Sequence, residues 1–203
     1  MRFVPIEIES QLFDYERLCD NSNECLLRRF VAIHNADGIT DYFQNQAVKD
    51  ERDFSVRNYV VKLKGTEVVI ACFTLKAGSI PFTDKAINLT FSKETKLVPG
   101  IELVNIALND MALKIIKKLP VKAGKNIFYD IVQPIVMHIS QEIGVKVLYL
   151  FAANPKLAEY YKSWGFFSFD DEPFNERLKK DWQKEYSQKC IFMYKPVAEI
   201  ENR

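Results

Sequence analysis

One carboxylate stands out because its surroundings would change its acidity. Glu102 is the single acidic residue of an otherwise apolar stretch, Ile101–Leu108 (IELVNIAL). Burial of a carboxylate raises its pKa, and a carboxylate with a raised pKa can serve as a general base near neutral pH. The plainer interpretation is that Glu102 lies at an exposed strand end and is solvated. Asn105, Asp110 and Glu159 are weaker alternatives for the same role.

Cysteine and histidine suggest no second chemistry. The cysteines have no CxxC spacing, and too few histidines accompany them, so no metal site is predicted. Cys72 lies in an apolar strand, where a buried thiol is expected to be unreactive. No histidine is placed to activate a cysteine as a nucleophile. The residues concerned are Cys19, Cys25, Cys72, Cys190, His34 and His138.

Length and charge narrow the class of protein. The chain has 203 residues and a net charge of +1, so a single domain over residues 1–203 is the simplest organisation and nucleic-acid binding is not expected. The first residues, MRFVPIEIES, lack an apolar signal core. No stretch approaches the roughly 20 apolar residues of a membrane helix, so no membrane partner is expected. Few, scattered cysteines predict a cytoplasmic protein with reduced thiols.

The stretch Gly144–Phe166 (GVKVLYLFAANPKLAEYYKSWGF) has the clearest local pattern. It begins with an apolar run typical of a strand covered on both faces. Asn154 and Pro155 supply a cap and a first-turn proline for a helix over Lys156–Trp164, which Gly165 ends. Because α/β folds bind ligands beyond the carboxyl ends of strands, this junction is a candidate ligand site.

The spacing within this stretch resembles the C-terminal signature of the GNAT superfamily of acyl-CoA-dependent N-acetyltransferases. There an Asn is followed seven residues later by a Tyr, and eleven and twelve residues later by Gly-Phe. Asn154, Tyr161, Gly165 and Phe166 match this spacing. The resemblance implies an α/β fold with a mixed, splayed central sheet flanked by helices, and acetyl-CoA as co-substrate. The plainer interpretation is an ordinary strand–helix unit in which Tyr161 packs.

The order of elements in the first half of the chain fits the same family. We expect a strand over Arg2–Glu9, a helix from Gln11, a second helix over Glu24–His34, and a hairpin of Tyr59–Lys64 with Glu67–Leu75. Residues 39–54 fit either a short helix or a loop over a pocket. Residues 77–100 predict a long connection over an active site.

The second half is predicted to alternate strands and helices. The pattern indicates a strand over Ile101–Asp110, an amphipathic segment over Met111–Pro120, a turn at Ala123–Asn126, and a helix over Ile127–Ile143 that Pro134 should kink or start anew. After the junction at Asn154 we expect a short strand from Phe167. A final strand over Cys190–Tyr194 and a frayed tail from Val197 end the chain.

The resemblance implies a phosphate cradle before the long helix. The family pattern there is Gln/Arg-x-x-Gly-x-Gly/Ala, and this chain, aligned on Gly124, has Val121 first and Asn126 last. Backbone N–H groups at a helix N-terminus suit phosphates, so Lys122, Gly124, Lys125 and Asn126 are the expected cofactor contacts. The plainer interpretation is a solvated basic turn, and the two departures favour weakened or lost acyl-CoA binding.

The resemblance also implies roles near the thioester. The backbone N–H of Ile106 or Leu108 would polarise its carbonyl. Glu102 stands in the strand where several members place a glutamate base. Tyr161 would protonate the departing sulfur, because a phenol is protonated at neutral pH. Asn154 would bond the pantetheine amide in addition to capping its helix.

The expected function is transfer of an acetyl group from acetyl-CoA to a primary amine by direct attack, without a metal. The alternative is a degenerate fold of this family that binds acyl-CoA, or regulates, without catalysis. The acceptor, a small molecule or a protein, cannot be read from the residues. A macromolecular acceptor, such as a protein N-terminus, a lysine or a charged tRNA in a toxin, is a third interpretation, and a homodimer is left open.

Overall fold

The computed structural model describes residues 10–19, 23–82, 96–168 and 190–198. The strand predicted over Arg2–Glu9 and the middle of the predicted connection, residues 83–95, lie outside these ranges. Both described ends of that connection are strand, residues 77–82 in β3 and 96–100 in β4, so the prediction of a connection is wrong there. The chain forms two compact units, each made of two segments. The first combines Met1–Lys76 with Leu103–His138, and the second combines Ala77–Glu102 with Ile139–Arg203.

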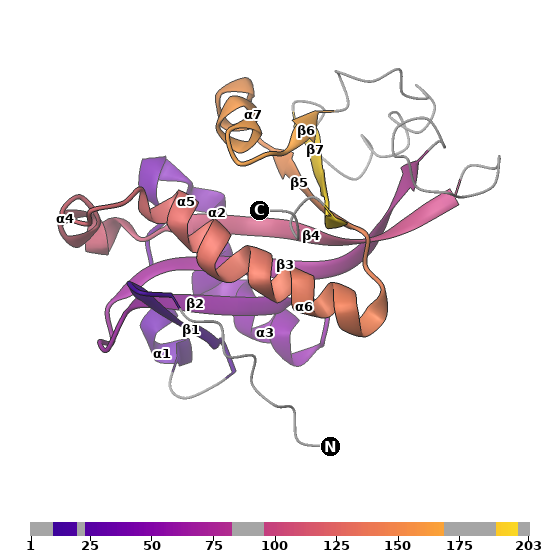
Figure 1. The fold of residues 1–203 in the computed structure, drawn as a ribbon. Helices are drawn as coiled ribbons and strands as arrows, with labels where there is room; N and C mark the ends of the chain where they lie inside the picture. Colours follow the sequence, from indigo (N-terminus) through magenta and orange to yellow (C-terminus); the bar gives the residue numbers. More distant parts are fainter. Residues whose placement is uncertain (1–9, 20–22, 83–95, 169–189, 199–203) are drawn as a thin grey trace. The chain divides into compact units, whose positions relative to one another are not determined.

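A mixed seven-stranded sheet carries strands of both units, in the order β1-β2-β3-β4-β5-β7-β6 (Figure 1). Strands β4 and β5 run parallel, whereas the pairs β1–β2, β2–β3, β5–β7 and β6–β7 are antiparallel. This mixed sheet with flanking helices confirms the predicted α/β class. The strands are β1 Phe13–Arg17, β2 Arg57–Leu63, β3 Val69–Phe82, β4 Lys96–Leu108, β5 Val147–Ala152, β6 Phe167–Ser168 and β7 Ile191–Pro196.

The first unit is built on the predicted hairpin of β2 and β3. Its turn contains Gly65 with φ of +71°, a left-handed conformation that glycine adopts without strain. The helix expected from Gln11 is wrong, because Phe13–Arg17 pairs with β2 instead. Ser10, a residue type that favours the N-cap of a helix, accepts a bond from the Leu12 N–H at 3.4 Å. That local signal is weaker than the ladder with β2, which satisfies the backbone of the whole segment.

Short helices cover one face of this hairpin. They are α1 Asn23–Leu27, the 3₁₀ turn η1 Ile33–Asn35, α2 Asp37–Asp41, the π turn η2 Tyr42–Gln46 and α3 Ala47–Arg52. Residues 39–54 are therefore helical up to Arg52, and the helix predicted over Glu24–His34 is shorter than expected. Phe30 and Phe43 meet edge to face at 5.2 Å and pack in one core with Val60 and Cys72.

A continuous helical run lies on the opposite side of the hairpin (Figure 1). It consists of α5 Ala123–Ile127, the π turn η4 Phe128–Val132 and α6 Gln133–Ile143, and it follows the short η3 Asp110–Ala112 and α4 Leu113–Ile116. The turn expected at Ala123–Asn126 is thus wrong: those residues are the first helical turn. Pro134 has no N–H for an ordinary helical bond, and the wider π turn immediately before it lets the helix continue.

The second unit has its own core, formed by Ile80, Val98, Val147, Tyr149 and Tyr194. Helix α7 Pro155–Lys162 lies beside β5, β6 and β7 (Figure 1). The strand predicted from Phe167 and the final strand are both present, as β6 and β7. The frayed tail is wrong at its start, because Val197 is buried and its N–H donates to the Lys146 carbonyl at 2.9 Å.

Candidate active site

The predicted strand–cap–helix–glycine junction is present in the second unit. Asn154 follows β5 with extended backbone, and its side-chain oxygen accepts a bond from the Leu157 N–H at 3.0 Å. Pro155 occupies the first turn of α7, where its missing N–H leaves no bond unmade. Gly165 has φ of +84° and ends the helix. The cap, the first-turn proline and the glycine after the helix are therefore confirmed, whereas the helix ends at Lys162, two residues before the predicted Trp164.

Tyr161 lies near the C-terminal end of α7 among aromatic rings. Its ring meets Trp164 edge to face at 5.2 Å and Phe166 at 6.0 Å. Burial, with a smaller contribution from the neighbouring Tyr160, raises the pKa of Tyr161 from 10.0 to about 12. The phenol therefore stays protonated well above neutral pH, which is the state that a proton donor needs. Tyr160 is 41% exposed and packs on Trp164 at 4.9 Å, as a packing residue would.

Glu102 is buried, with 4% of its surface exposed. The interpretation that it is solvated at a strand end is wrong. It lies in β4 directly opposite Tyr149 of β5 in a parallel pair. Among the alternatives, Asn105 is half-buried, Asp110 is exposed, and Glu159 is exposed and pairs with Lys162 at 3.1 Å. Glu102 is thus the most enclosed of the four candidates for a base.

Two glycines leave room for Tyr149 beside Glu102. A Cβ atom at Gly78 would stand 2.1 Å from the Tyr149 Oη, and one at Gly100 would stand 2.8 Å from a Val147 methyl carbon and 3.1 Å from the Tyr149 ring. Real Cβ atoms essentially never come within 3.0 Å of another atom, so an alanine at Gly78 requires Tyr149 to move and an alanine at Gly100 requires Val147 to move. The sequence contains no periodic signal for this relationship, because the residues come from three different strands.

Ile106 and Leu108 lie in the part of β4 that belongs to the first unit. Both side chains are half-buried. The strand ends at Leu108. The N–H of the next residue, Asn109, donates to the Ile70 carbonyl at 2.8 Å, and its side chain accepts a bond from the Met111 N–H at 3.2 Å. Whether a thioester carbonyl meets either backbone N–H remains a prediction.

The predicted phosphate cradle is the first turn of the long helix of the first unit. Lys122 precedes the helix with extended backbone, and its carbonyl accepts the bond from the Asn126 N–H at 3.0 Å. The N–H groups of Ala123, Gly124 and Lys125 precede the first helical bond, and free N–H groups at a helix start attract anions. The helical start makes this segment better suited to a phosphate than the loose turn that its sequence predicts.

Asn126 carries a buried oxygen that has no hydrogen-bond donor among the described residues. A buried acceptor without a hydrogen bond is rare in native proteins, so a donor for this oxygen is expected. The family pattern has Gly or Ala where this chain has Asn126. The asparagine therefore adds a hydrogen-bonding group to the cradle as well as a larger side chain. An N–H group of a bound ligand is one donor that fits this oxygen.

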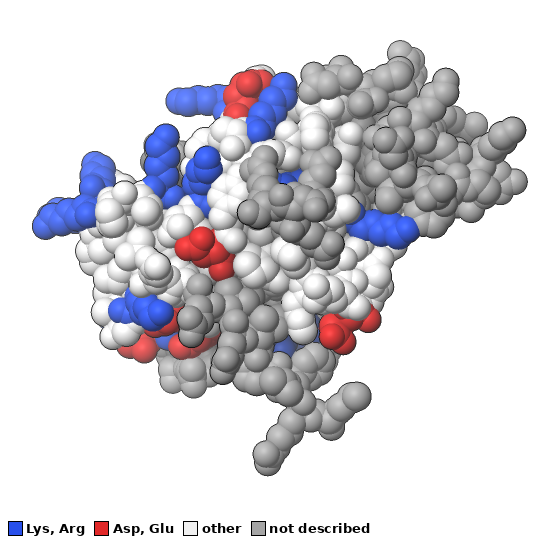
Figure 2. Space-filling model, viewed as in Figure 1, with Lys and Arg blue, Asp and Glu red and all other residues white. Residues whose placement is uncertain are grey.

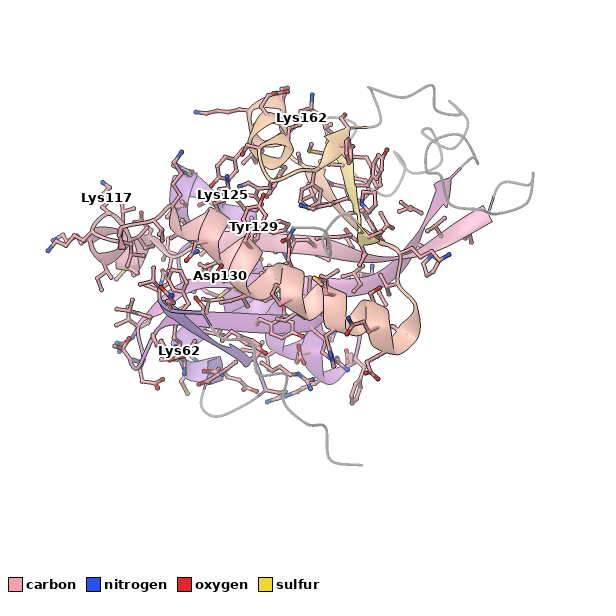
Figure 3. All side chains as sticks on the ribbon, in the orientation of Figure 1. Lys62, Lys117, Lys125, Tyr129, Asp130 and Lys162 are labelled. Atoms are coloured by element: carbon pink, nitrogen blue, oxygen red, sulfur yellow. The ribbon has the colours of Figure 1, made fainter. Side chains whose placement is uncertain are left out.

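Lysines gather around the cradle on the surface of the first unit. Figure 2 shows blue side chains over the region where α4 and α5 lie. Sequence reasoning assigned Lys122 and Lys125, but three further exposed lysines of α4 and the following loop add to the same positive field. Lys125 also lies over the Tyr129 ring, with its Nζ 5.6 Å from the ring centroid (Figure 3). The exposed lysines are Lys114, Lys117, Lys118, Lys122 and Lys125.

Glu51 of the first unit is a second buried carboxylate that the sequence did not single out. It is 4% exposed, and it accepts bonds from the Asn58 N–H at 2.6 Å and from Arg17 at 3.1 Å. Arg57 adds a cation at 3.8 Å. A carboxylate so fully engaged holds α3 to β1 and β2, and has little capacity left to accept a substrate proton.

Several other functional interpretations find no support. Cys72 is fully buried, and burial raises the pKa of its thiol, so it is the inert core residue that the sequence predicts. Among the described residues, no cluster of His, Cys, Asp and Glu side chains could hold a metal ion. No described helix has the length and apolarity to span a bilayer.

Comparison with known proteins identifies the fold. No protein-family model and no curated protein sequence matches the chain. A tyrosine-to-phenylalanine variant of the toxin AtaT matches with a TM-score of 0.66 and 18% identity over 98% of both chains. A variant of KacT with the same kind of change gives 0.67 and 14% identity, over 95% of this chain and 99% of that one. AtaTR bound with acetyl-CoA gives 0.66 and 18%, over 95% and 98%.

These likenesses extend over nearly the whole of each chain, and at such low identity they establish the fold. The chain therefore shares its GNAT-like fold with the toxin AtaT and with KacT. The fold that the spacing of Asn154, Tyr161, Gly165 and Phe166 predicts is thereby confirmed.

Proposed function

We propose that this chain is an acetyl-CoA-dependent N-acetyltransferase that transfers the acetyl group directly to a primary amine. The observation that carries the proposal is the GNAT fold, shared over nearly the whole chain with a toxin bound to acetyl-CoA. Two features of the second unit support it: a buried carboxylate at Glu102 and a phenol at Tyr161 that stays protonated. The first unit adds a helix start with a positive field.

The reaction assigns one proton to each of these side chains. The amine nitrogen attacks the thioester carbonyl carbon, the carbon–sulfur bond breaks, and an amide and a thiol form. Glu102, through a water, takes the proton that the amine loses, and Tyr161 gives a proton to the sulfur. The backbone N–H of Ile106 or Leu108 stabilises the negative charge that develops on the carbonyl oxygen.

Binding of the cofactor phosphates is assigned to the first unit. The backbone at Gly124 and Lys125 offers N–H groups at a helix start, and Lys122 adds positive charge. Asn126 offers its unsatisfied oxygen to an N–H group of the ligand. In the second unit, Asn154 is proposed to bond the pantetheine amide while its oxygen caps α7.

The neighbours suggest the biological setting of this activity. AtaT has been solved with the C-terminus of the antitoxin AtaR and acetyl-CoA, and KacTA with DNA. On this basis we propose that the chain acts as a toxin-type acetyltransferase whose activity a partner protein controls. A toxin-type role favours a macromolecular acceptor, such as a protein amine, and a small amine fits the same chemistry.

A non-catalytic acyl-CoA-binding or regulatory module is the second candidate. Val121, where the family pattern has Gln or Arg, is 37% exposed, and Asn126 replaces a small residue. Both departures are in the phosphate-binding pattern, whereas the residues around Tyr161 keep the family spacing. Such a module would bind acyl-CoA without turnover, or would not bind it at all.

Calorimetric titration with acetyl-CoA tests the proposal directly. We expect saturable binding with one site per chain and, on addition of a mixed pool of amine acceptors, release of free thiol. Absence of binding at millimolar acetyl-CoA would remove the enzymatic function. Binding without thiol release from any acceptor pool, cell extract included, would favour the non-catalytic module.

A further inference from the structure

Lys195 is a lysine that the protein buries almost completely. It lies in β7 with 1% of its surface exposed, opposite Leu148 of β5. Its Nζ donates to the backbone carbonyl of Trp164 at 2.8 Å, in a buried hydrogen bond. A buried ammonium group is unfavourable unless its hydrogen bonds are made, so this bond must contribute to holding the structure around it.

The accepting carbonyl belongs to the end of α7. Trp164 stands two residues after the last helical residue, Lys162, and its N–H donates back to the Tyr161 carbonyl at 2.9 Å. Carbonyl groups at a helix C-terminus lack helical partners and carry partial negative charge. A cation is the partner that this end favours, and Lys195 supplies it from a neighbouring strand.

Helix α7 is therefore attached at both ends to one pair of strands. Asn154, two residues after the end of β5, caps the first turn of α7. Lys195, in β7, bonds to the carbonyl beyond its last turn. Because β5 and β7 pair along their whole length, the two attachment points belong to one rigid ladder. A short helix fixed in this way has little freedom to rotate or slide over the sheet.

The Lys195 attachment lies next to the candidate acid. Trp164 is 2% exposed, and its ring meets the Tyr161 ring edge to face at 5.2 Å. The N–H of Phe166 also donates to the Tyr161 carbonyl, and the Phe166 ring packs against the Tyr161 ring with centroids 6.0 Å apart. A shift of the Trp164 backbone would therefore move the aromatic surroundings that orient the Tyr161 phenol.

We propose that Lys195 is a positioning residue for Tyr161: by bonding to the Trp164 carbonyl, it fixes the end of α7 and so the direction of the Tyr161 hydroxyl. Lys195 acts through Trp164 and takes no part in the chemical step. The proposal rests on the proposed function only in that Tyr161 is the acid. The mechanical link from Lys195 to Tyr161 stands without it and can be measured without a substrate.

The test compares Lys195→Met with Lys195→Arg and with a matched control, Lys156→Met, which removes an exposed lysine at the start of the same helix. The first measurement is the alkaline titration of the Tyr161 phenol, isolated as the difference between each protein and its Tyr161→Phe counterpart. We expect Lys195→Met to lower the pKa of Tyr161 from about 12 towards 10.0, because a displaced ring gains water. Arg at 195 and Met at 156 should leave it unchanged. The neighbouring charged and titratable side chains are the same in every variant, so they do not change the comparison. They are Glu159, Tyr160 and Lys162 of α7, and Tyr194 beside Lys195.

The second measurement separates positioning from general stability. In Lys195→Met we expect kcat for acetyl transfer to fall about tenfold while the affinity for acetyl-CoA changes less than about twofold. Partial recovery of kcat in Lys195→Arg would support the role of the bond to Trp164.

An unchanged Tyr161 titration in a folded Lys195→Met protein would overturn the proposal. Should Met at 195 prevent folding, Lys195→Gln takes its place: a lowered Tyr161 pKa together with a lowered kcat supports the proposal, and an unchanged Tyr161 titration contradicts it. Failure of acetyl-CoA binding in the wild-type protein would remove the proposed function but leave the titration result valid.

Discussion

The ring of Trp164 meets the ring of Tyr161 edge to face, with centroids 5.2 Å apart. This contact makes Tyr161 both a packing residue and a candidate acid. The apolar ring faces that surround the phenol remove water from it, and the loss of water disfavours the phenolate. The two interpretations that the sequence leaves open for Tyr161 therefore describe the same arrangement, because the packing produces the protonated state that catalysis would use.

The first prediction concerns stability at alkaline pH. Burial raises the pKa of Tyr161 from 10.0 to about 12. Below pH 10 the Tyr161 phenol is protonated in both the folded and the unfolded chain, so its protonation does not lower the free energy of unfolding. As the pH rises from 10 towards 12, the unfolded chain loses this proton first, and the free energy of unfolding falls by an amount on the order of 2 kcal/mol.

The check is urea denaturation at a series of alkaline pH values, for the wild-type protein and for Tyr161→Phe. We expect the free energy of unfolding of the variant to fall less steeply above pH 10. Tyr59 in the first unit, whose pKa burial also raises to about 12, supplies a similar slope that Tyr161→Phe leaves in place. Parallel curves for the two proteins would contradict the assigned pKa of Tyr161.

The second prediction concerns the cap at Asn154. Replacement of an N-cap by Ala costs about 1 kcal/mol of stability, because the N–H at Leu157 loses its acceptor. We therefore expect Asn154→Ala to lower the free energy of unfolding by this amount, and Asn154→Ser, which keeps an oxygen acceptor, to restore most of it. Equal stability of the Ala and Ser variants would exclude the cap. Weaker acetyl-CoA binding in a stable Ser variant would measure the second role proposed for the amide.

Local signals explain why this junction and the β2–β3 hairpin could be predicted. Gly65 and Gly165 both adopt positive φ, and Asn154 bonds to a residue only three positions away. Each of these features depends on a few neighbouring residues, so their types alone specify the geometry. The family spacing around Asn154 is a consequence of the same local physics.

Non-local bonds explain what could not be predicted. Strand β1 exists because β2 offers it a pairing edge far along the chain: Phe13 pairs with Leu63, 50 residues later. Locally, Ser10 favours a helix, because serine is a common N-cap. Lys195 lies in a strand whose pattern gives no reason to bury a charge. Its burial depends on the Trp164 carbonyl, 31 residues earlier. Propensity and periodicity contain no information about such partners.

The third prediction concerns the space that Gly78 leaves for Tyr149. A Cβ atom there would stand 2.1 Å from the Tyr149 Oη, so Gly78→Ala should displace the ring and destabilise the protein by about 1–3 kcal/mol. Gly38→Ala is the matched control, because nothing lies within 4 Å of its Cβ position. Denaturation curves give both values. Tyr149→Phe removes the clashing oxygen, so adding it to Gly78→Ala should recover part of the loss, and strictly additive losses would contradict the clash.

The fourth prediction concerns the lysines at the start of the long helix. Lys122 and Lys125 are exposed, and each exposed charge beside a phosphate contributes about 0.3–1 kcal/mol at low salt. We expect Lys122→Gln and Lys125→Gln each to weaken acetyl-CoA binding about two- to fivefold in calorimetry. The effect should shrink as ionic strength rises, because salt screens exposed charges.

Lys49→Gln is the control for this prediction, since Lys49 is an exposed lysine of α3 in the same unit and changes the net charge equally. If Lys49→Gln weakens binding as much as Lys122→Gln, the effect comes from overall charge and the cradle has no special role. If the cradle variants bind as the wild type does, the phosphates lie elsewhere. The departures at Val121 and Asn126 would then mark a change in how this chain holds its ligand. A selective loss in the two cradle variants would instead show that the helix start holds phosphate through its N–H groups and lysines, even where the family's terminal glycine is replaced.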